Sequence, residues 1–270
     1  GEELDPPKFG QVQISIKPKG GTYVSDFNKT QIKNKLKNYA IAGINATIVD
    51  LKILYVELNS TIYYNPAQVA SASNLRTTIV SSLDNYARNI EINKFGGRFK
   101  YSKLNTLIDR VDNGITSNIT KVIIRRDLKA LLNQFAQYEL CFGNRFNINP
   151  AGYNIKSTGF TVLGSNETAY LTDVPNKDAA GNLDGSMKGT LSAVFKNEKD
   201  KQQVLIKDAG IVDYKKGEII LNTINITSTA SENNIIEVQA FPESNDVVGL
   251  KDLYLSFDVS KSTINMFKDV

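Results

Sequence analysis

The spacing of apolar residues changes near residue 129, and this change divides the 270-residue chain into two parts of different architecture. Before it, segments with helical spacing alternate with segments in which every second residue is apolar. After it, helical spacing disappears, and short alternating runs are separated by clusters of Gly, Asn and Asp. We therefore expect an α+β fold with a linker over 1–10, an α/β-mixed domain over 11–130 and an antiparallel β-rich domain over 131–270.

The first domain follows the order β-α-β-α-α-β. Apolar residues at every second position predict a strand over 11–16, and the apolar markers Ile119, Val122 and Ile124 predict another over 118–126. Between them, residues 47–64 are dense in β-branched and aromatic side chains, which predicts one long strand or two strands with a break near Asp50. This order predicts a small sheet with helices packed on one face.

Three helices are expected in this domain. The first is capped by Ser25 or Asp26, whose side-chain oxygens can accept hydrogen bonds from the free N–H groups of a first turn. A long helix follows Pro66, and a short helix follows the pair Gly96-Gly97. The apolar seam of the long helix consists of Leu75, Ile79, Leu83, Tyr86 and Ile90.

The second domain is expected to be built from short antiparallel strands. The alternating runs lie at 137–142, 160–163, 189–195, 203–206, 218–221, 235–240 and 253–257. Lys215-Lys216-Gly217 predicts a hairpin loop in which Gly supplies a positive φ. Residues 176–187 have too few apolar side chains to pack, so they should form an exposed loop.

The composition excludes several classes of chemistry. The chain contains no His, which excludes His-dependent triads, His general bases and His-ligated metals. Its one Cys, Cys141, excludes intrachain disulfides, Cys-cluster zinc sites and iron–sulfur centres. Cys141 lies in an apolar run, where a packing role is the common one. We therefore expect no cofactor and no metal site.

Charge and hydropathy bear on possible partners. The formal net charge is +4 and the pI is near 8.9, below the level typical of nucleic-acid-binding domains, so no nucleic acid partner is expected. No apolar run approaches the roughly 18 residues that cross a bilayer, so no membrane partner is expected either. Residues 1–10 are acidic and contain Pro, which is typical of a linker and suggests a fragment of a longer chain.

Carboxylates are the remaining candidates for acid–base chemistry. The pairs Asp109/Asp112 and Asp208/Asp213 could serve a glycosidase, but acids near turns more often cap and solvate the chain. Oxygen-bearing side chains near the polar loop could bind calcium, although their spacing fits no EF-hand and a polar loop is the simpler interpretation. These side chains are Asp173, Asp178, Asn182 and Asp184.

Several segments resemble the baseplate wedge proteins of T-even-type phages, the gene product six family, within the wider baseplate J-like family of contractile tails. They occur in a consistent order along nearly the whole chain, and the resemblance is to the C-terminal part of that family. The segments are Gly1-Glu2-Glu3-Leu4-Asp5-Pro6-Pro7-Lys8-Phe9-Gly10, Ile62-Tyr63-Tyr64-Asn65-Pro66, Phe99-Lys100-Tyr101-Ser102-Lys103-Leu104 before Ile108-Asp109, Asp213-Tyr214-Lys215-Lys216-Gly217-Glu218-Ile219 and Phe257-Asp258-Val259-Ser260-Lys261-Ser262.

The resemblance implies a non-enzymatic structural subunit in the tail baseplate of a phage virion. Members of the family join neighbouring wedges into a ring, contact other wedge proteins and rearrange when the sheath contracts. The expected partners are therefore further copies of the chain and other baseplate wedge subunits, and the family supplies no catalytic residue.

Two segments are candidate protein interfaces. Residues 94–101 interleave basic and aromatic side chains around two glycines, a composition that could stack bases but that more often anchors a turn or a protein contact. Residues 259–267 are mildly amphipathic and lie near the C-terminus. The candidate interface residues are Phe95, Arg98, Phe99, Tyr101, Lys261, Ile264, Met266 and Phe267.

Two other functions remain open at the level of sequence. The β-rich domain with its polar loop would suit a receptor- or carbohydrate-binding tail module, although the absence of Trp removes the largest aromatic platform for sugars. A carboxylate-based hydrolase acting on the cell wall is the third interpretation.

Overall fold

The computed structural model describes residues 10–19, 24–39, 44–88, 92–197, 199 and 201–269. The expected linker over residues 1–9 and the helix-seam residue Ile90 lie outside the described residues. The fold is α+β and mostly strand, as expected. Its elements are β1 (Gln11–Ser15), α1 (Asp26–Lys37), β2 (Asn45–Val49), β3 (Lys52–Tyr64), α2 (Ala72–Ala87), β4 (Lys94–Phe95), β5 (Arg98–Phe99), α3 (Tyr101–Asp109), β6 (Ile115–Lys129), β7 (Phe135–Cys141), β8 (Lys156–Ser157), β9 (Phe160–Val162), β10 (Tyr170–Pro175), β11 (Lys188–Lys196), β12 (Gln202–Asp213), β13 (Glu218–Thr229), η1 (Glu232–Asn234), β14 (Ile235–Ala240), β15 (Val247–Val248), β16 (Leu253–Phe257) and β17 (Thr263–Lys268).

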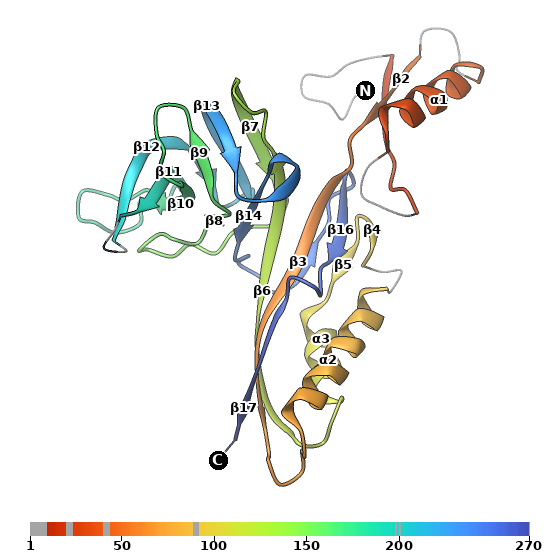
Figure 1. The fold of residues 1–270 in the computed structure, drawn as a ribbon, viewed down its shortest axis with the longest axis vertical. Coiled ribbons are helices and arrows are strands. Elements are labelled where there is room, and N and C mark those ends of the chain that lie inside the picture. Colours follow the sequence, from red (N-terminus) through yellow and green to blue (C-terminus); the bar gives the residue numbers. More distant parts are fainter. Residues whose placement is uncertain are drawn as a thin grey trace.

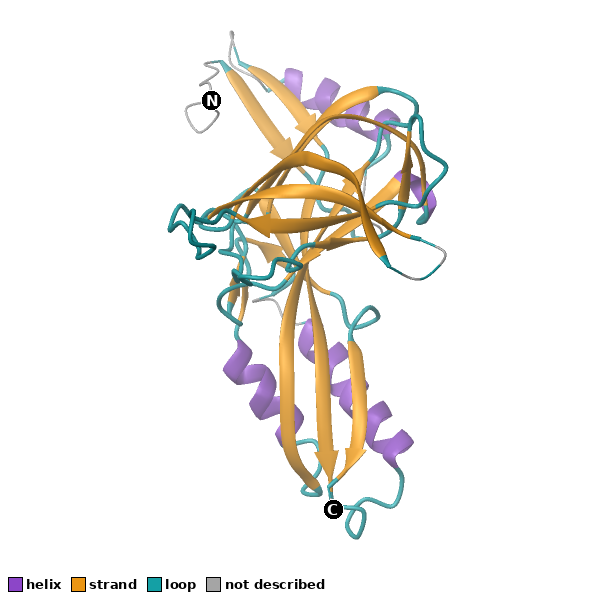
Figure 2. Ribbon diagram, turned by 90° about the vertical axis from the view of Figure 1, so that its left-hand side faces the viewer, coloured by secondary structure: helices purple, strands orange, loops and turns teal. Residues whose placement is uncertain are grey.

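Three regions make up an elongated molecule (Figure 1). The N-terminal unit, β1-α1-β2, lies at one end, and a long central sheet with α2 and α3 on one face runs to the other end. A β domain formed by β7 and β9–β13 projects from the opposite side of the central sheet. The tip at which β17 ends lies far from the N-terminal unit in both views (Figures 1 and 2).

The N-terminal unit is a two-stranded parallel sheet covered by one helix. Ser25 caps α1, because its Oγ accepts the N–H of Asn28 at 3.3 Å, which confirms one of the two predicted caps. Val12 pairs with Ala46 and Ile14 pairs with Ile48, so these apolar side chains share one face. No described residue between 10 and 50 is buried.

The predicted break near Asp50 is confirmed, because β2 ends at Val49 and β3 begins at Lys52. The break separates two sheets: β1 and β2 form their own pair, while β3 enters a seven-stranded sheet. The expectation of one sheet for all strands before residue 130 is therefore wrong. Alternation identifies each strand but does not identify its neighbours.

The central sheet has the strand order β4-β16-β3-β6-β14-β8, and β17 pairs with β3 beyond the end of β16. Alternate residues of β3 and β6 are buried beneath α2 and α3. The predicted seam of α2 is confirmed at three positions, and Tyr86 packs partly buried beside them. The buried residues of this layer include Leu54, Val56, Leu58, Ile62, Leu75, Ile79, Leu83, Leu104, Ile108, Val122 and Ile124.

Four described strands that follow residue 130 return to the central sheet. β14 pairs antiparallel with β6 and with β8, while β16 and β17 pair in parallel with β3. The expected boundary near 130 coincides with the end of β6, but the residues after it do not form one separate β unit. The β domain is instead inserted between two parts of the central sheet.

The β domain is antiparallel, with the order β10-β11-β12-β13-β7 and β9 pairing with β13. The predicted hairpin at Lys215-Lys216-Gly217 joins β12 to β13. Gly217 has φ +68°, its N–H donates to Asp213 O at 2.9 Å, and a Cβ there would clash with the carbonyl oxygen of Asn144. The loop over 176–187 is exposed, as expected.

Candidate interaction surface

The predicted interface residues fall in two separate places. Three of them lie in the turn that carries β4 and β5, Tyr101 begins α3 directly after it, and four lie in or just before β17 (Figure 1). The turn faces the middle of the central sheet, whereas β17 runs along the sheet edge at the distal tip. The residues within each predicted group therefore lie close together in the structure, but the two groups lie apart from each other.

The aromatic residues of the turn pack against the body of the molecule. The Phe95 ring meets the Tyr254 ring edge-on at 5.5 Å, and Phe99 is 1% exposed in the core. The Tyr101 hydroxyl donates to the carbonyl of Thr120 at 2.8 Å. Phe99 therefore contributes no surface, because β5 points Arg98 outward and the next residue inward. An interface at this turn stays a prediction that depends on Arg98.

β17 places its residues on alternate faces. Ile264 is buried, and Met266 packs partly buried against the core on the helix-covered face. Phe267 points to the opposite face, is 51% exposed, and has its ring 5.9 Å from the ring of Tyr63. Lys261, just before the strand, forms an ion pair with Glu237 at 2.9 Å.

Among the described residues, no helix or further strand covers the sheet face around Phe267 (Figures 1 and 2). We call it the open face and define it by Thr61, Tyr63, Ile119, Asn265 and Phe267, which come from three adjacent strands in register. Ile119 is 54% exposed there. Figure 2 shows these lower strands toward the viewer, with the β domain above them. Large apolar side chains on such a face are typical of a protein contact.

Sequence reasoning missed Tyr63 and Ile119. The signal was present in the period of two: residues 122 and 124 lie on the buried face of β6, so residue 119 must lie on the other face. Ile119 was instead counted with Val122 and Ile124 as one more apolar marker of the strand. The detectable signal was an apolar residue at an odd number of positions from the other apolar residues of its strand.

A buried charge cluster fixes the turn that precedes β17. The Arg125 guanidinium contacts four carboxylates from four segments, and its plane lies 4.2 Å from the centre of the Tyr55 ring. The nitrogen–oxygen distances are 2.6 Å to Glu57, 3.0 Å to Asp127, 3.0 Å to Glu237 and 2.8 Å to Asp258. The cluster ties β3, β6 and β14 to the turn after β16.

Burial dominates the electrostatics of this cluster. It raises the pKa of Glu57 and of Asp127 above the usual range of a carboxyl group, while the positive charge of Arg125 opposes the rise in both. Burial and neighbouring carboxylates raise the pKa of Tyr55 to about 12. All these groups have protein partners, which indicates a structural cluster.

The turn itself is held by further hydrogen bonds. The Asp258 N–H donates to Val56 O at 2.8 Å, and the Leu58 N–H donates to the Ser262 Oγ at 3.0 Å. The Ser262 hydroxyl in turn donates to the Asp258 carbonyl at 2.8 Å. Because β3 pairs with β16 before the turn and with β17 after it, these bonds set the register at which β17 joins the edge.

The candidate carboxylates for catalysis have structural contacts. Asp112 accepts the Gly114 N–H at 2.7 Å, and Asp213 accepts the Lys216 N–H at 2.9 Å. Their predicted partners Asp109 and Asp208 are exposed. These contacts are the turn-capping roles expected of acids at such positions.

The oxygen-bearing residues near the polar loop do not converge either. Asp173 is buried and accepts hydrogen bonds from the Tyr214 hydroxyl and the Ile155 N–H, both at 2.7 Å. Asp178 accepts the N–H of Asn182 at 2.9 Å, and Asp184 accepts the N–H of Ser186 at 2.8 Å. Within the described ranges, no three acidic or Cys side chains are grouped as metal ligands.

Cys141 ends β7 and is half-buried. Burial raises the pKa of its thiol, and the Glu218 carboxylate nearby raises it further. A thiol with a raised pKa is a weak nucleophile, since the reactive species is the thiolate. The expected packing role agrees with this position.

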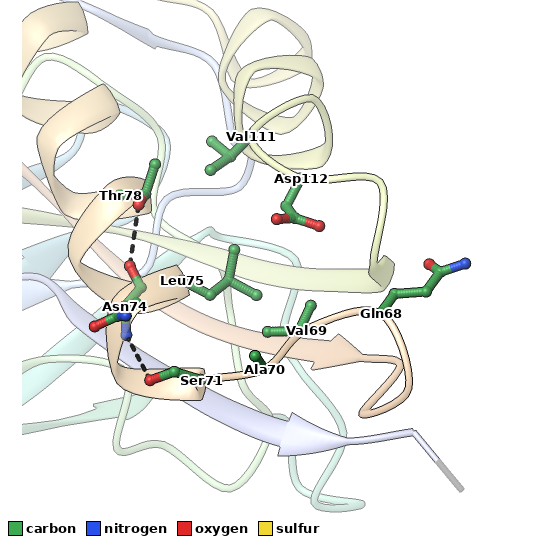
Figure 3. A pocket seen from close by; sticks show the side chains of 9 residues that line it. All are labelled: Gln68, Val69, Ala70, Ser71, Asn74, Leu75, Thr78, Val111 and Asp112. Atoms are coloured by element: carbon green, nitrogen blue, oxygen red, sulfur yellow. Dashed lines mark hydrogen bonds between the residues drawn. The ribbon is translucent and has the colours of Figure 1, made fainter.

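A shallow hollow of about 230 Å³ lies between the start of α2 and the end of α3 (Figure 3). Its polar rim is already used by the fold. The Ser71 Oγ accepts the Asn74 N–H at 3.3 Å, and the Thr78 hydroxyl donates to the Asn74 carbonyl at 3.0 Å. These contacts cap and stabilise α2. Across the described part of the chain, no helix has the length and hydropathy needed to span a membrane.

Comparisons with known proteins agree with a function that depends on protein contacts. A family model described as baseplate structural protein gp6, C-terminal domain I, matches residues 1–49, and one described as C-terminal domain III of the same protein matches residues 52–127. Baseplate wedge protein gp6 of Enterobacteria phage T4 is 28% identical over 127 residues, which cover 46% of this chain. Over residues 1–49 and 52–127, the chain is gp6-like, that is, similar to a baseplate wedge protein. It therefore belongs to the tail baseplate of a phage virion.

The matched ranges follow the structure of the gp6-like chain closely. They meet at residues 49–52, where β2 ends and β3 begins. The range of domain III ends within β6, so the β domain and the strands that complete the central sheet lie outside both ranges. The chain spans about a fifth of the length of the T4 protein, since the matching segment is 19% of it.

Proposed function

We propose that this gp6-like chain is a non-enzymatic structural subunit that joins baseplate wedges into a ring by self-association and contacts other baseplate proteins. The observation that carries the proposal is the free edge of β17. One side of β17 pairs with β3, and among the described residues no strand pairs with its other side. A free edge presents unpaired N–H and C=O groups that can pair with another chain.

A second copy fits this edge by antiparallel pairing of β17 with its equivalent. Such a contact is isologous, because the same residues face each other about a two-fold axis. It would merge two central sheets into one and bring together the two open faces, each with Tyr63, Ile119 and Phe267. Main-chain pairing and apolar side chains then act in the same interface.

A two-fold contact alone makes a dimer, so a ring requires a second contact. The exposed Arg98 at the β4–β5 turn is the candidate from this chain, because Arg often anchors interfaces and this turn lies away from β17. Other baseplate proteins are the alternative source of that contact.

The non-enzymatic part of the proposal rests on two observations. The matched relative is a structural protein of the baseplate by its description. The candidate acids Asp112, Asp173 and Asp213 are engaged by backbone or Tyr donors of the fold. Hydrolysis of peptidoglycan by the wild-type chain that is lost when one of these residues is replaced by Asn would contradict this part.

Sedimentation velocity from low to high micromolar concentration tests self-association. We expect a reversible dimer whose dissociation constant rises at least about tenfold in Phe267→Asp, which places a charge at the exposed interface. Val174→Asp is the matched control, because Val174 is also an exposed apolar strand residue but lies on β10. A strict monomer over the whole range would contradict self-association through these residues.

Cross-linking tests the geometry of the contact. In an antiparallel pair of β17 strands, Cys residues introduced at Thr263, Asn265 or Phe267 differ in their distance from the two-fold axis, and one of them should form a disulfide dimer rapidly. Asn59→Cys is the control, since this exposed residue lies on the same sheet face on β3, between Thr263 of β17 and Lys121 of β6. Equal cross-linking at all four positions would contradict edge pairing.

A further inference from the structure

The N-terminal unit, β1-α1-β2, lacks a buried layer. Its sheet has two strands, and no described residue between 10 and 50 is buried. Two strands and one helix of this kind have little stability of their own, because burial of apolar area is the main stabilising contribution. Phe27 of α1 is 71% exposed, and Tyr39 just after it is 86% exposed. A further element packed against the unit would supply the burial that it lacks.

Both outer edges of this two-stranded sheet are open. Among the described residues, β1 pairs only with β2, and β2 pairs only with β1. The Asn45 N–H donates to Gly10 O at 2.7 Å, so the main-chain groups of Asn45 point toward β1. Because successive residues alternate, the N–H and C=O groups of Ala46 and Ile48 point to the open side of β2. An extended polypeptide that pairs there would add a third strand.

The positive charge of the protein is concentrated in this unit. Residues 10–50 contain six Lys, two Asp and no other charged residue, so their net charge of +4 equals the formal net charge of all 270 residues. Lys29, Lys33 and Lys37 recur every four residues along one side of α1. Lys29 forms an ion pair at 2.7 Å with Asp50, which directly follows β2, so this side of α1 is the one next to β2. Lys33 and Lys37 form no ion pair with any residue that the structure describes.

Charge and strand pairing together decide among the possible occupants. A second copy of the unit carries the same positive charge and would be repelled. Nucleic acid would match the charge, but a sugar–phosphate backbone cannot extend the hydrogen-bond ladder of a strand. An extended acidic polypeptide matches both features, because α1 packs beside β2 and places its Lys side chains near the open edge (Figure 1).

We propose that the N-terminal unit is a docking site for an acidic, extended segment of a partner protein. The segment pairs with the open edge of β2 through the main-chain groups of Ala46 and Ile48. Its carboxylates form ion pairs with Lys33 and Lys37 of α1. The partner is not a second copy and the site lies far from β17, so this contact goes beyond the proposed self-association.

Short peptides test the site on the full chain. The acidic probe is acetyl-Glu-Thr-Glu-Val-Glu-Thr-Glu-amide, and its two controls carry Gln or Lys in place of every Glu. We expect the acidic peptide to bind with a dissociation constant on the order of 10–100 μM at low salt, and at least about tenfold more weakly in about 0.5 M salt. The Gln peptide should also bind at least about tenfold more weakly. Equal binding of the acidic and Gln peptides, or tighter binding of the Lys peptide, would overturn the proposal.

Charge-reversal variants locate the binding site. Lys33→Glu combined with Lys37→Glu should weaken binding of the acidic peptide at least about tenfold. Lys207→Glu combined with Lys215→Glu is the matched control, because both residues are exposed in the β domain and the net charge changes equally. Equal losses in the two double variants would show that net charge alone attracts the peptide, and this result would overturn the proposal.

Ala46→Pro tests strand addition. It removes an N–H that points away from β1, so the pairing of β1 with β2 is kept. We expect this variant to bind the acidic peptide at least about tenfold more weakly. In the wild type, the peptide should slow hydrogen exchange at the Ile48 amide, which needs no variant. Unchanged exchange at Ile48, or full binding by Ala46→Pro, would overturn the proposal.

Two results would identify a different occupant and overturn the proposal. The first is a short single-stranded DNA that binds more tightly than the acidic peptide and displaces it. The second concerns residues 1–9, which contain Glu2, Glu3 and Asp5. If the peptide binds only after these residues are removed, the site belongs to the chain's own segment. Phe267→Asp should leave peptide binding unchanged, so this test is independent of self-association through β17.

Discussion

Nη2 of Arg125 lies 2.8 Å from Oδ2 of Asp258, across 133 residues of sequence. This contact joins the middle of β6 to the turn between β16 and β17. The same guanidinium also holds carboxylates of β3 and β14, so one side chain links β3, β6 and β14 to the turn between β16 and β17. The candidate edge strand therefore depends on a charge cluster for its position.

Loss of Arg125 should destabilise the protein strongly. Arg125→Met removes the cation and leaves several carboxylates partly buried without it, which typically costs about 3–5 kcal/mol of unfolding free energy. Urea unfolding measures the loss. Lys261→Met is the control, because Lys261 is half-exposed and its ion pair with Glu237 should contribute less than about 1 kcal/mol. Similar effects of the two variants would contradict a central role for Arg125.

Glu57 should make stability depend on pH in a defined direction. Burial raises the pKa of Glu57 in the folded state. The contribution of Glu57 to the free energy of unfolding is therefore largest below its unfolded pKa of about 4.3, and it is lost as the pH rises through its folded pKa. Glu57→Gln removes this decline. The unfolding free energy of the variant minus that of the wild type should therefore increase from pH 4 to pH 7. A difference that falls over this range would show that attraction to Arg125 outweighs burial.

The buried pair Tyr214–Asp173 should stabilise the β domain. Tyr214→Phe removes the hydroxyl that donates to Asp173 at 2.7 Å, and loss of a buried hydrogen bond to a carboxylate should cost about 1.5–3 kcal/mol. Tyr138→Phe removes a hydroxyl that accepts the exposed Leu131 N–H, and it should cost less than about 1 kcal/mol. Thermal unfolding compares the two variants, and equal losses would contradict the assignment.

Gly217 should tolerate no side chain. Gly217→Ala forces a left-handed backbone, at about 1–2 kcal/mol, and in addition presses a Cβ against the Asn144 carbonyl. Gly181→Ala is the matched control, because Gly181 also has a positive φ but would have no atom within 4 Å of its Cβ. The difference in unfolding free energy between the two variants measures the clash. No difference would show that the hairpin shifts to relieve it.

Local elements followed from the sequence because they depend on near neighbours. The seam of α2, the break at Asp50 and the turn at Gly217 each need only spacing, capping or a positive φ. The pairing of β16 and β17 with β3 could not be predicted this way, because alternation marks a strand without naming its partner. The placement of the β domain as an insertion depends on that same pairing.

The sequence predicted only part of the candidate surface, because alternation does not show how strands are placed in the sheet. Phe267 was found because an exposed aromatic in an amphipathic terminal segment suggests an interface. Phe99 was misjudged, because composition does not say which face of a two-residue strand looks inward.

The arrangement of β3 and β17 has a consequence for synthesis. The N–H of Leu58 binds the Oγ of Ser262, 204 residues later, so the ribosome needs roughly 10–40 s after making β3 before it can supply the strand that covers its edge. Until then β3 is itself an open edge, available to nascent neighbours. A chain released before residue 263 lacks β17, so under the proposed self-association it could not pair with a partner, and translation through β17 would act as a check on completeness.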